Sequence, residues 1–174
     1  MTCTPVNDAI GAWQPMRPAD LAATVRLADE VFPDYREDRA VFAEKLWLYP
    51  EGCFVLPLDT ENVGGYVFSH PWITGRVPAL NQKLGALPPQ CDCLYLHDLT
   101  LAPARRGQGL AGAMVRRLET HARQAAFERL ALTSLAGSTA FWRAAGFRHG
   151  TLLSDEAPLT AYGPGAQYMV RDLR

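Results

Sequence analysis

The sequence contains no long apolar run and no leader pattern. No stretch approaches the roughly 18 to 20 apolar residues that a membrane-spanning helix needs, and residues 1–15 lack the basic region followed by an apolar one that marks a secretory signal. We therefore expect a cytoplasmic protein with no membrane partner. With 20% charged and 48% hydrophobic residues the chain matches the globular average, and its 174 residues suit one domain.

Cysteine is scarce, and its spacing indicates no site. The four cysteines, Cys3, Cys53, Cys91 and Cys93, form neither a C-x-x-C pair nor a dense disulfide framework, so we expect reduced thiols. The run Cys91-Asp92-Cys93 offers fewer ligands than a structural zinc site needs. The sequence therefore predicts no metal site.

Charge is nearly balanced in total but not along the chain. The formal net charge is −1, yet residues 1–101 carry −6 and residues 102–150 carry +6. A basic segment of this size favours an anionic ligand, although solvated helix faces would give the same composition. The segment does not interleave aromatic with basic residues, so a nucleic acid is the weakest candidate partner.

Hydrophobic periodicity predicts an α/β fold. Helical segments show apolar residues at three- and four-residue steps, and strands appear as short β-branched or aromatic runs between turn residues. One strand–helix–strand unit should be parallel, within an otherwise antiparallel sheet. The expected helices cover residues 19–32, 39–49, 110–125 and 138–145, and the expected strands cover residues 53–58, 63–69, 94–101, 130–135 and 168–173.

Residues 71–90 lie outside this pattern. Four prolines and two glycines interrupt regular structure there. A loop of that length in a compact domain is usually a functional lid or a disordered segment. We expect a lid inserted into a single domain that spans residues 1–174.

A glycine-rich turn precedes the clearest helix. The sequence Arg-Arg-Gly-Gln-Gly-Leu-Ala at 105–111 connects the strand at 94–101 to the helix at 110–125. Glycine allows a ligand to approach the backbone, and a helix N-terminus supplies unpaired N–H donors with partial positive charge. The turn suits a pyrophosphate, although a tight turn without a ligand would use glycine equally well. It lacks the Gly-Lys-Ser/Thr ending and the third glycine of other phosphate-binding loops.

Two segments resemble a known family. Residues 94–111 are similar to motif A of the GNAT superfamily of N-acetyltransferases, whose Arg/Gln-x-x-Gly-x-Gly/Ala pattern is matched by Arg106, Gly109 and Ala111. Residues 141–147, Phe-Trp-Arg-Ala-Ala-Gly-Phe, resemble the family's second signature, at the family's spacing. The resemblance covers nearly the whole chain except the loop at 71–90. It implies a GNAT-like domain with a mixed, mostly antiparallel sheet that is splayed at the strand Leu94 to Leu101 and has helices on both faces.

The resemblance also implies acetyl-CoA as the acyl donor. In the family, this cofactor lies where the motif A strand splays from the next strand. Its pantetheine amides pair with the strand backbone, its pyrophosphate lies over the glycine turn, and a helix arginine reaches its 3'-phosphate. The cofactor-binding residues expected on this basis are Leu99, Thr100, Leu101, Arg105, Arg106, Gly107, Gln108, Gly109, Leu110, Ala111, Ser138, Phe141 and Trp142.

His97 is the expected catalytic base, with Asp98 beside it as a second catalytic candidate. Its position on the splayed strand resembles that of histidines in arylalkylamine N-acetyltransferases, which deprotonate the amine through water, and residues 48–51 are also similar to that group. An ammonium ion cannot attack a thioester, and histidine is the side chain whose pKa starts near neutrality. The alternative is a structural histidine satisfied by Asp98 or the backbone.

The second signature departs from the family pattern at Trp142. Many members have a tyrosine there that protonates the departing thiolate, whereas an indole N–H is not a useful proton source near neutral pH. Either Tyr168 supplies this proton or the thiolate leaves unaided, which a thiol pKa of about 8.5 allows.

The acceptor should lie between the first two helices, the hairpin at 53–69 and the proline-rich loop. Aromatic side chains near a carboxylate suit an amine with an apolar body. We expect acetyl transfer to a small-molecule primary amine by a monomer or homodimer. The alternatives are a protein N-terminal or lysine acetyltransferase and a non-catalytic acetyl-CoA-binding module. The candidate acceptor residues, several of which would serve equally well in the core, are Phe32, Tyr35, Tyr49, Glu51, His70 and Trp72.

Overall fold

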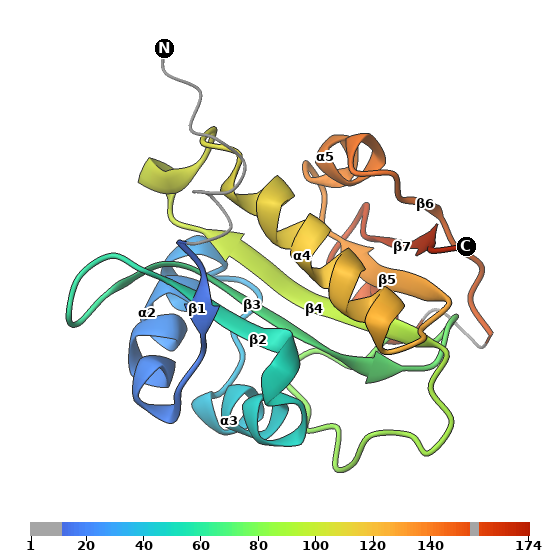
Figure 1. Cartoon of the computed structure of the whole chain (residues 1–174), viewed down its shortest axis with the longest axis horizontal. Coiled ribbons are helices and arrows are strands. Elements are labelled where there is room, and N and C mark those ends of the chain that lie inside the picture. Colours follow the sequence, from blue (N-terminus) through green and yellow to red (C-terminus); the bar gives the residue numbers. More distant parts are fainter. Residues whose placement is uncertain (1–11, 154–156) are drawn as a thin grey trace.

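Residues 12–153 and 157–174 are described by the computed structural model, and their strands form one mixed sheet in the order β1-β2-β3-β4-β5-β7-β6 (Figure 1). All neighbouring strands are antiparallel except β4 and β5, which are parallel. The predicted fold class is therefore confirmed. The strands are β1 (Gln14–Pro15), β2 (Cys53–Pro57), β3 (Val63–Trp72), β4 (Cys93–Leu101), β5 (Arg129–Ser134), β6 (Arg148–His149) and β7 (Gln167–Asp172).

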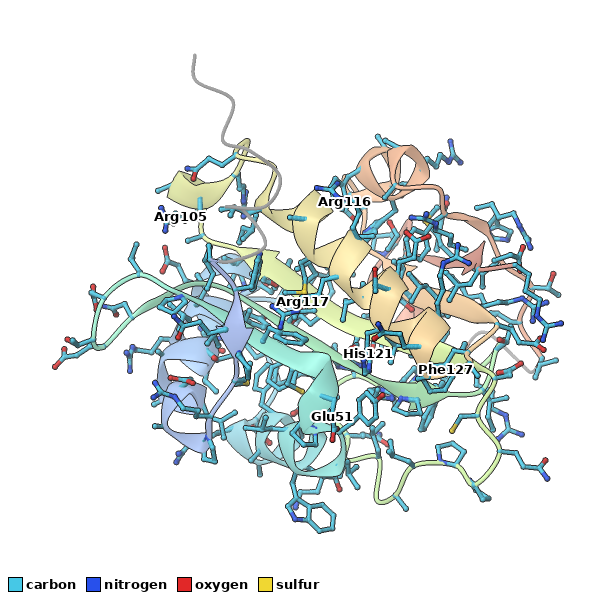
Figure 2. The ribbon with its side chains drawn as sticks, viewed as in Figure 1. Glu51, Arg105, Arg116, Arg117, His121 and Phe127 are labelled. Carbon is cyan, nitrogen blue, oxygen red and sulfur yellow. The ribbon has the colours of Figure 1, made fainter. Side chains whose placement is uncertain are left out.

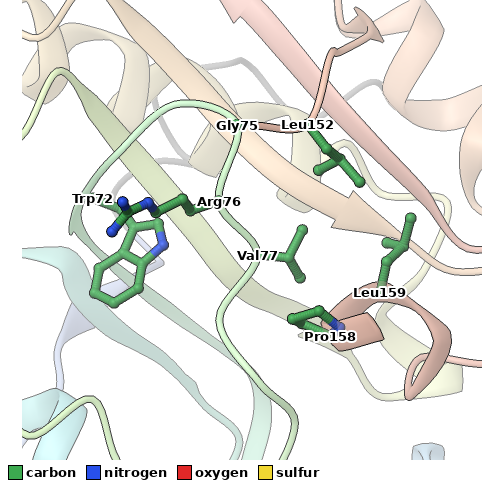
Figure 3. Close-up of a pocket in the computed structure, with 7 residues that line it drawn as sticks. All are labelled: Trp72, Gly75, Arg76, Val77, Leu152, Pro158 and Leu159. Atoms are coloured by element: carbon green, nitrogen blue, oxygen red, sulfur yellow. The ribbon is translucent and has the colours of Figure 1, made fainter. Parts of the chain in front are cut away.

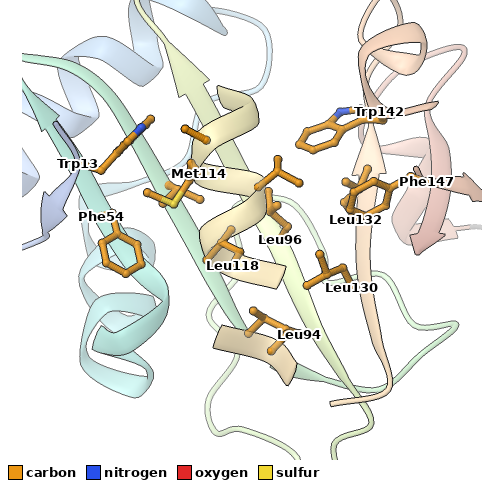
Figure 4. Packing of buried hydrophobic residues seen from close by; sticks show 14 of the residues in the cluster. Trp13, Phe54, Leu94, Leu96, Met114, Leu118, Leu130, Leu132, Trp142 and Phe147 are labelled. Carbon is orange, nitrogen blue, oxygen red and sulfur yellow. The ribbon is translucent and has the colours of Figure 1, made fainter. Parts of the chain in front are cut away.

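Helices cover both faces of this sheet. On one face, α4 (Leu110–Gln124) buries Met114 and Leu118 completely in the larger core cluster, over β4 and β5 (Figure 4). On the other face, Phe42 packs against Tyr66 and Phe68 of β3. That face is covered by α2 (Leu21–Val31) and α3 (Arg39–Leu48), and the chain also forms α5 (Thr139–Ala144) and α6 (Ala157–Thr160).

β3 is longer than the sequence predicted. It continues through Pro71 to Trp72, so the loop that follows covers residues 73–92. Proline has no N–H to donate, but beyond Phe68 the strand has a neighbour on one side only, because β2 no longer pairs with it there. The short elements β1, β6 and α6 were not predicted, since so few residues carry no periodic pattern.

β4 and β5 separate halfway along their length. They pair from Cys93 opposite Arg129 to Leu96 opposite Leu132. Beyond that point β4 remains paired with β3 and β5 remains paired with β7. The predicted splay is therefore present, and β4 leaves it directly into the glycine turn before α4.

The described residues include three of the four cysteines. Cys53, Cys91 and Cys93 are free thiols, and Cys3 lies outside the described residues. Across residues 12–153 and 157–174, no group of three or more His, Cys, Asp or Glu side chains is placed to hold a metal ion. No helix in the same ranges combines the length and apolar character that a membrane crossing requires.

Candidate active site

His97 lies at a β-bulge where the sheet begins to splay. Phe68 pairs with Asp98 and Ser69 pairs with Leu96, so His97 is an extra residue without a partner on β3. An extra residue shifts the alternation of side chains along a strand. His97 and Asp98 therefore both face away from α4, toward the side covered by α2 and α3.

The His97 imidazole is buried and paired with a glutamate from a distant part of the chain. Its side chain is 2% exposed, and its Nε2 lies 2.9 Å from Oε1 of Glu37, in the segment between α2 and α3. A carboxylate can only accept, so Nε2 carries the proton and Nδ1 keeps the lone pair. Within the described chain, this buried Nδ1 has no hydrogen-bond partner.

Glu37 also holds a buried lysine. Its Oε2 lies 3.4 Å from Nζ of Lys45, which is 1% exposed, and it accepts the backbone N–H of Asn81 at 3.1 Å. Burial opposes ionisation of Glu37, but His97 and Lys45 hold its pKa down at about 2. Burial lowers the pKa of Lys45. The result is a buried carboxylate shared by the Lys45 ammonium and the His97 imidazole.

Asp98 is satisfied by hydroxyl groups and not by His97. Tyr66 donates to its Oδ2 at 2.5 Å, and Thr100 donates to its Oδ1 at 2.7 Å. Burial raises the pKa of this carboxyl group. The Tyr66–Asp98 bond joins β3 to β4 beside the bulge, and the Thr100 hydroxyl holds the Asp98 carboxylate from within β4.

His70 and Trp72 extend the cluster along β3. The His70 ring is fully buried, lies 6.0 Å from the His97 ring and meets the Trp72 indole edge-on at 5.2 Å. Its Nδ1 donates to the carbonyl of Pro71 at 3.1 Å, and its Nε2 has no partner among the described residues. Burial lowers the pKa of His70 to about 3, so this imidazole is neutral at physiological pH.

Tyr168 lies on β7 beneath the loop at 73–92. Its hydroxyl accepts the N–H of Gly75 at 2.7 Å, which leaves its own hydrogen available for donation. Burial raises its pKa to about 12, so the hydroxyl remains protonated. Tyr168 shares a core cluster with Tyr95, whose ring stacks on His70. The candidate acid and the candidate base thus lie on the same side of the sheet.

Tyr49 and Glu51 are not brought to this cluster. The Tyr49 hydroxyl lies 2.7 Å from Nε2 of His121 on α4, and its ring packs on the core beneath α4. Glu51 is exposed, and Figure 2 shows it, like His121, on the α4 side of the sheet. Both residues therefore lie on the face opposite His97. Phe32 follows the end of α2 and is half-buried, and Tyr35 contacts the chain before β7 at Gly163.

The glycine turn at 105–111 is open. Gly107 and Gly109 have φ angles of 71° and 75°, and a Cβ added to either would meet no atom of the described residues within 4 Å. Gly109 is the N-cap of α4, and among the described residues no side chain caps this end, so the first N–H groups of the helix point toward this space. Leu110 and Ala111 supply the first of these N–H groups. A left-handed turn whose backbone N–H groups have no side-chain acceptor among the described residues suits the binding of a pyrophosphate.

The splayed part of β4 also presents backbone groups. The N–H of Ala102 donates to the carbonyl of Gly64 at 2.9 Å. In an antiparallel pair this bond turns the N–H and C=O of Leu101, and by alternation those of Leu99, away from β3. They point to the side that β5 has left, as expected for pairing with pantetheine. The Arg106 guanidinium donates to the Leu101 carbonyl at 3.2 Å and so covers one of these groups.

The remaining predicted cofactor residues lie around this opening in different ways. A pocket of about 490 Å³ between α4 and α5 is lined by Phe141, which is 40% exposed, and by Arg116. Trp142 is buried in the core against Phe147 at 5.4 Å (Figure 4). Ser138 donates to the carbonyl of Leu135. Arg105 packs over Gly64, and Gln108 donates to the carbonyl of Ala104.

Sequence reasoning missed Glu37 and Lys45. Glu37 lies in a run of charged residues between two helices, where composition predicts exposure. Lys45 carried a usable signal, because it lies four residues after Val41 and three after Phe42, on the apolar stripe of its helix. A charged side chain on a buried stripe needs a partner, and Glu37 is that partner.

Comparison with known proteins identifies similar chains. A family model described as "Acetyltransferase (GNAT) family" matches residues 21–147. The solved structure of the GphF GNAT-like decarboxylase in complex with isobutyryl-CoA is 20% identical, with a TM-score of 0.73 over 93% of this chain and 99% of that one. Naa20 of Chaetomium thermophilum, in complex with a bisubstrate analogue, is 16% identical, with a TM-score of 0.68 over 92% and 85% of the two chains. Rv2747 of Mycobacterium tuberculosis, in complex with CoA and NLQ, is 17% identical, with a TM-score of 0.67 over 93% and 99%. No curated protein sequence matches the chain.

Proposed function

Since this chain belongs to the acetyltransferase (GNAT) family and is an acetyl-CoA-dependent acyltransferase, we propose that it acetylates a primary amine of a small molecule, with His97 as the base. The observation that carries the proposal is the buried Glu37–His97 pair at the bulge where β4 parts from β5. A proton acceptor at that point stands beside the expected position of the thioester.

The residues around the splay fit the cofactor. Within residues 12–153 and 157–174, two left-handed glycines border open space and no side chain caps the N-terminus of α4. Leu99 and Leu101 present backbone groups on the side that β5 has left. Acetyl-CoA supplies an activated acetyl thioester when bound. Residues 107–111 would hold its pyrophosphate, and Phe141 with Arg116 would lie beside its adenosine half.

The chain's own residues can move the proton of the incoming ammonium group. Nδ1 of His97 accepts this proton directly or through water. Glu37 holds the Nε2–H and stabilises the imidazolium that results. The unprotonated Nε2 of His70 offers an uncharged acceptor that can orient the amine. Tyr168 is the candidate donor to the departing thiolate.

A small acceptor is favoured because the loop at 73–92 is tied down over this side. Tyr162 donates to the carbonyl of Pro78 at 2.8 Å, Glu37 accepts from Asn81, and Glu44 accepts from Leu84 at 2.6 Å. A loop held at these points encloses a compact ligand more readily than a protein chain. Acetylation of protein N-termini or lysines is therefore the weaker alternative.

Decarboxylation of an acyl-CoA that carries a carboxylate on its α-carbon, such as malonyl-CoA, is a second candidate function. One similar structure is a GNAT-like decarboxylase, and the His97 side chain of this chain is almost completely buried. In that reaction the bond from the α-carbon to the carboxylate breaks, carbon dioxide leaves, and the α-carbon takes a proton. A buried imidazolium could deliver that proton without any amine.

Release of free thiol from acetyl-CoA, measured with a panel of primary amines, tests the proposed function. Amine-dependent thiol release with formation of the acetylated amine supports it. Thiol release with none of the amines, together with carbon dioxide and acetyl-CoA formed from malonyl-CoA, would favour the decarboxylase instead.

A further inference from the structure

A separate pocket lies on the His97 side of the sheet. Its volume is about 270 Å³, and it is bounded by the end of β3, the start of the loop at 73–92 and, between β6 and β7, Leu152, Pro158 and Leu159. Figure 3 shows Trp72 and Arg76 on one side, Leu152 and Leu159 on the other, and Val77 between them. We call it the Trp72 pocket.

The walls of the Trp72 pocket are apolar, and its polar side chains are donors. Val77, Leu152 and Leu159 present hydrocarbon. Of the side chains that line it in the described chain, those of Trp72 and Arg76 carry polar atoms, and both can only donate hydrogen bonds. The Trp72 Nε1 is buried and has no partner among the described residues. A ligand that satisfies both donors must present acceptor oxygens, and a carboxylate presents two with the charge that Arg76 requires.

Direct contacts join the Trp72 pocket to the catalytic cluster. The Trp72 indole meets the His70 ring at 5.2 Å, and the His70 ring lies 6.0 Å from that of His97. Gly75, which lines the pocket, donates its N–H to Tyr168. A molecule with its carboxylate at Arg76 would therefore need its amine at the opposite end to approach His70 and His97.

We propose that the Trp72 pocket binds the acetyl acceptor and that this acceptor is an ω-amino carboxylate, with a carboxylate and a primary amine at opposite ends of an apolar body. This inference rests on the proposed function, because it takes the ligand of the pocket to be the acceptor. A simple arylalkylamine would leave the buried Trp72 Nε1 without an acceptor and would leave Arg76, which is exposed, paired with solvent alone. Sites built to bind a polar group reject analogues that lack it.

Matched acceptors test the proposal. 4-(Aminomethyl)benzoate and benzylamine differ only in the carboxylate, and kcat/KM is measured for both with the wild type, Arg76→Met, Arg76→Lys and Lys83→Met. Lys83 is an exposed cation on the same loop that does not line the pocket. The wild type should prefer the carboxylate at least tenfold. Arg76→Met should remove most of that preference, because KM should rise much more for the carboxylate than for benzylamine. Arg76→Lys should keep part of the preference, and Lys83→Met should keep all of it.

Equal losses on both acceptors with Arg76→Met, or no loss on either, would overturn the assignment. A calorimetric titration of 4-(aminomethyl)benzoate into the CoA-bound protein separates this inference from the proposed function. Binding that weakens at least tenfold in Arg76→Met without any acetyl transfer would uphold the pocket and refute the acetyltransferase proposal. Transfer to amines with no dependence of binding on Arg76 would refute the pocket and uphold the transferase.

Discussion

The two sides of the splayed strand β4 are built in opposite ways. The glycine turn is one continuous segment, residues 105–111, and it offers backbone N–H groups to open space. The cluster around His97 is assembled from α3, β3, β4 and the segment before α3, and its polar atoms are buried side chains. A phosphate can be held by local backbone geometry, whereas proton transfer needs side chains whose charges stabilise one another away from water.

The largest effect on the difference between the two sides is expected from substitution of Glu37. In Glu37→Gln the buried Lys45 ammonium loses its carboxylate, and removal of one partner of a buried ion pair typically costs about 3 to 5 kcal/mol. We expect the free energy of unfolding at pH 7, measured by denaturant titration, to fall by about 3 kcal/mol. The double variant Glu37→Gln/Lys45→Met should recover much of this loss.

An exposed ion pair provides the control for this prediction. Glu128 pairs with Arg174 at 2.6 Å, and the side chains are 42% and 81% exposed. Glu128→Gln should change the free energy of unfolding by less than about 1 kcal/mol. If Glu37→Gln costs no more than this control, the buried cluster is not held together by its charges.

The next effect should appear in catalysis. His97→Ala should lower acetylation of a strongly basic amine near pH 7 by on the order of 10², which corresponds to about 2.7 kcal/mol in the barrier. The loss should shrink as pH rises toward the pKa of the amine, and it should be small for a weakly basic aryl amine. Rates measured from pH 6 to 10 on both amines, with acetyl-CoA affinity as the control, test this. A uniform loss across pH and amines would mean that His97 only shapes the strand.

The two sides also differ in how far they could be predicted. The turn and α4 depend on glycine positions and local periodicity, and the splay was implied by the family resemblance; all three are present in the structure. The bulge at His97 could not be predicted, because strict alternation would place His97 and Leu99 on the same face. Because of the extra residue, His97 and Asp98 face the same side of the sheet, and Leu99 faces α4 on the other side.

Side-chain partners that are far apart in the sequence also could not be predicted. Glu37 and His97 are 60 residues apart, and no local pattern links them. Tyr49 was expected near the acceptor, but its hydroxyl pairs with His121 on the opposite face, 72 residues away. Both pairings depend on which face of the sheet a residue reaches, and that is set by tertiary packing.

His70 gives a smaller, pH-dependent effect. Burial holds the pKa of His70 near 3 in the folded protein, whereas an unfolded histidine has a pKa of about 6.5. Below pH 6.5 the unfolded chain therefore binds a proton at His70 that the folded protein does not bind, and this favours unfolding. Stability should therefore fall by about 2 kcal/mol between pH 7.5 and pH 5 from this residue alone. Denaturant titrations at both pH values should show that the free energy of unfolding of His70→Gln lacks this part of the decrease between pH 7.5 and pH 5. His149→Gln, at an exposed histidine on β6, should keep it, and equal slopes in all three proteins would contradict the assignment.

The smallest effect is expected from a substitution in the glycine turn at 105–111. A matched pair of glycines separates its effect on acetyl-CoA binding from its effect on stability. Gly109 and Gly85 both have a φ of 75°, and a Cβ at either would meet nothing within 4 Å, but Gly109 lies in the turn before α4 and Gly85 lies in the loop at 73–92. Valine is disfavoured at positive φ at both sites, so Gly109→Val and Gly85→Val should lose similar amounts of stability.

Only Gly109→Val should place a branched side chain where the pyrophosphate approaches. Calorimetric titration with acetyl-CoA should therefore show at least a tenfold weaker affinity, about 1.4 kcal/mol, for Gly109→Val and no change for Gly85→Val. Equal affinities in the two variants would place the pyrophosphate elsewhere, because the space over Gly109 would then have no ligand to exclude.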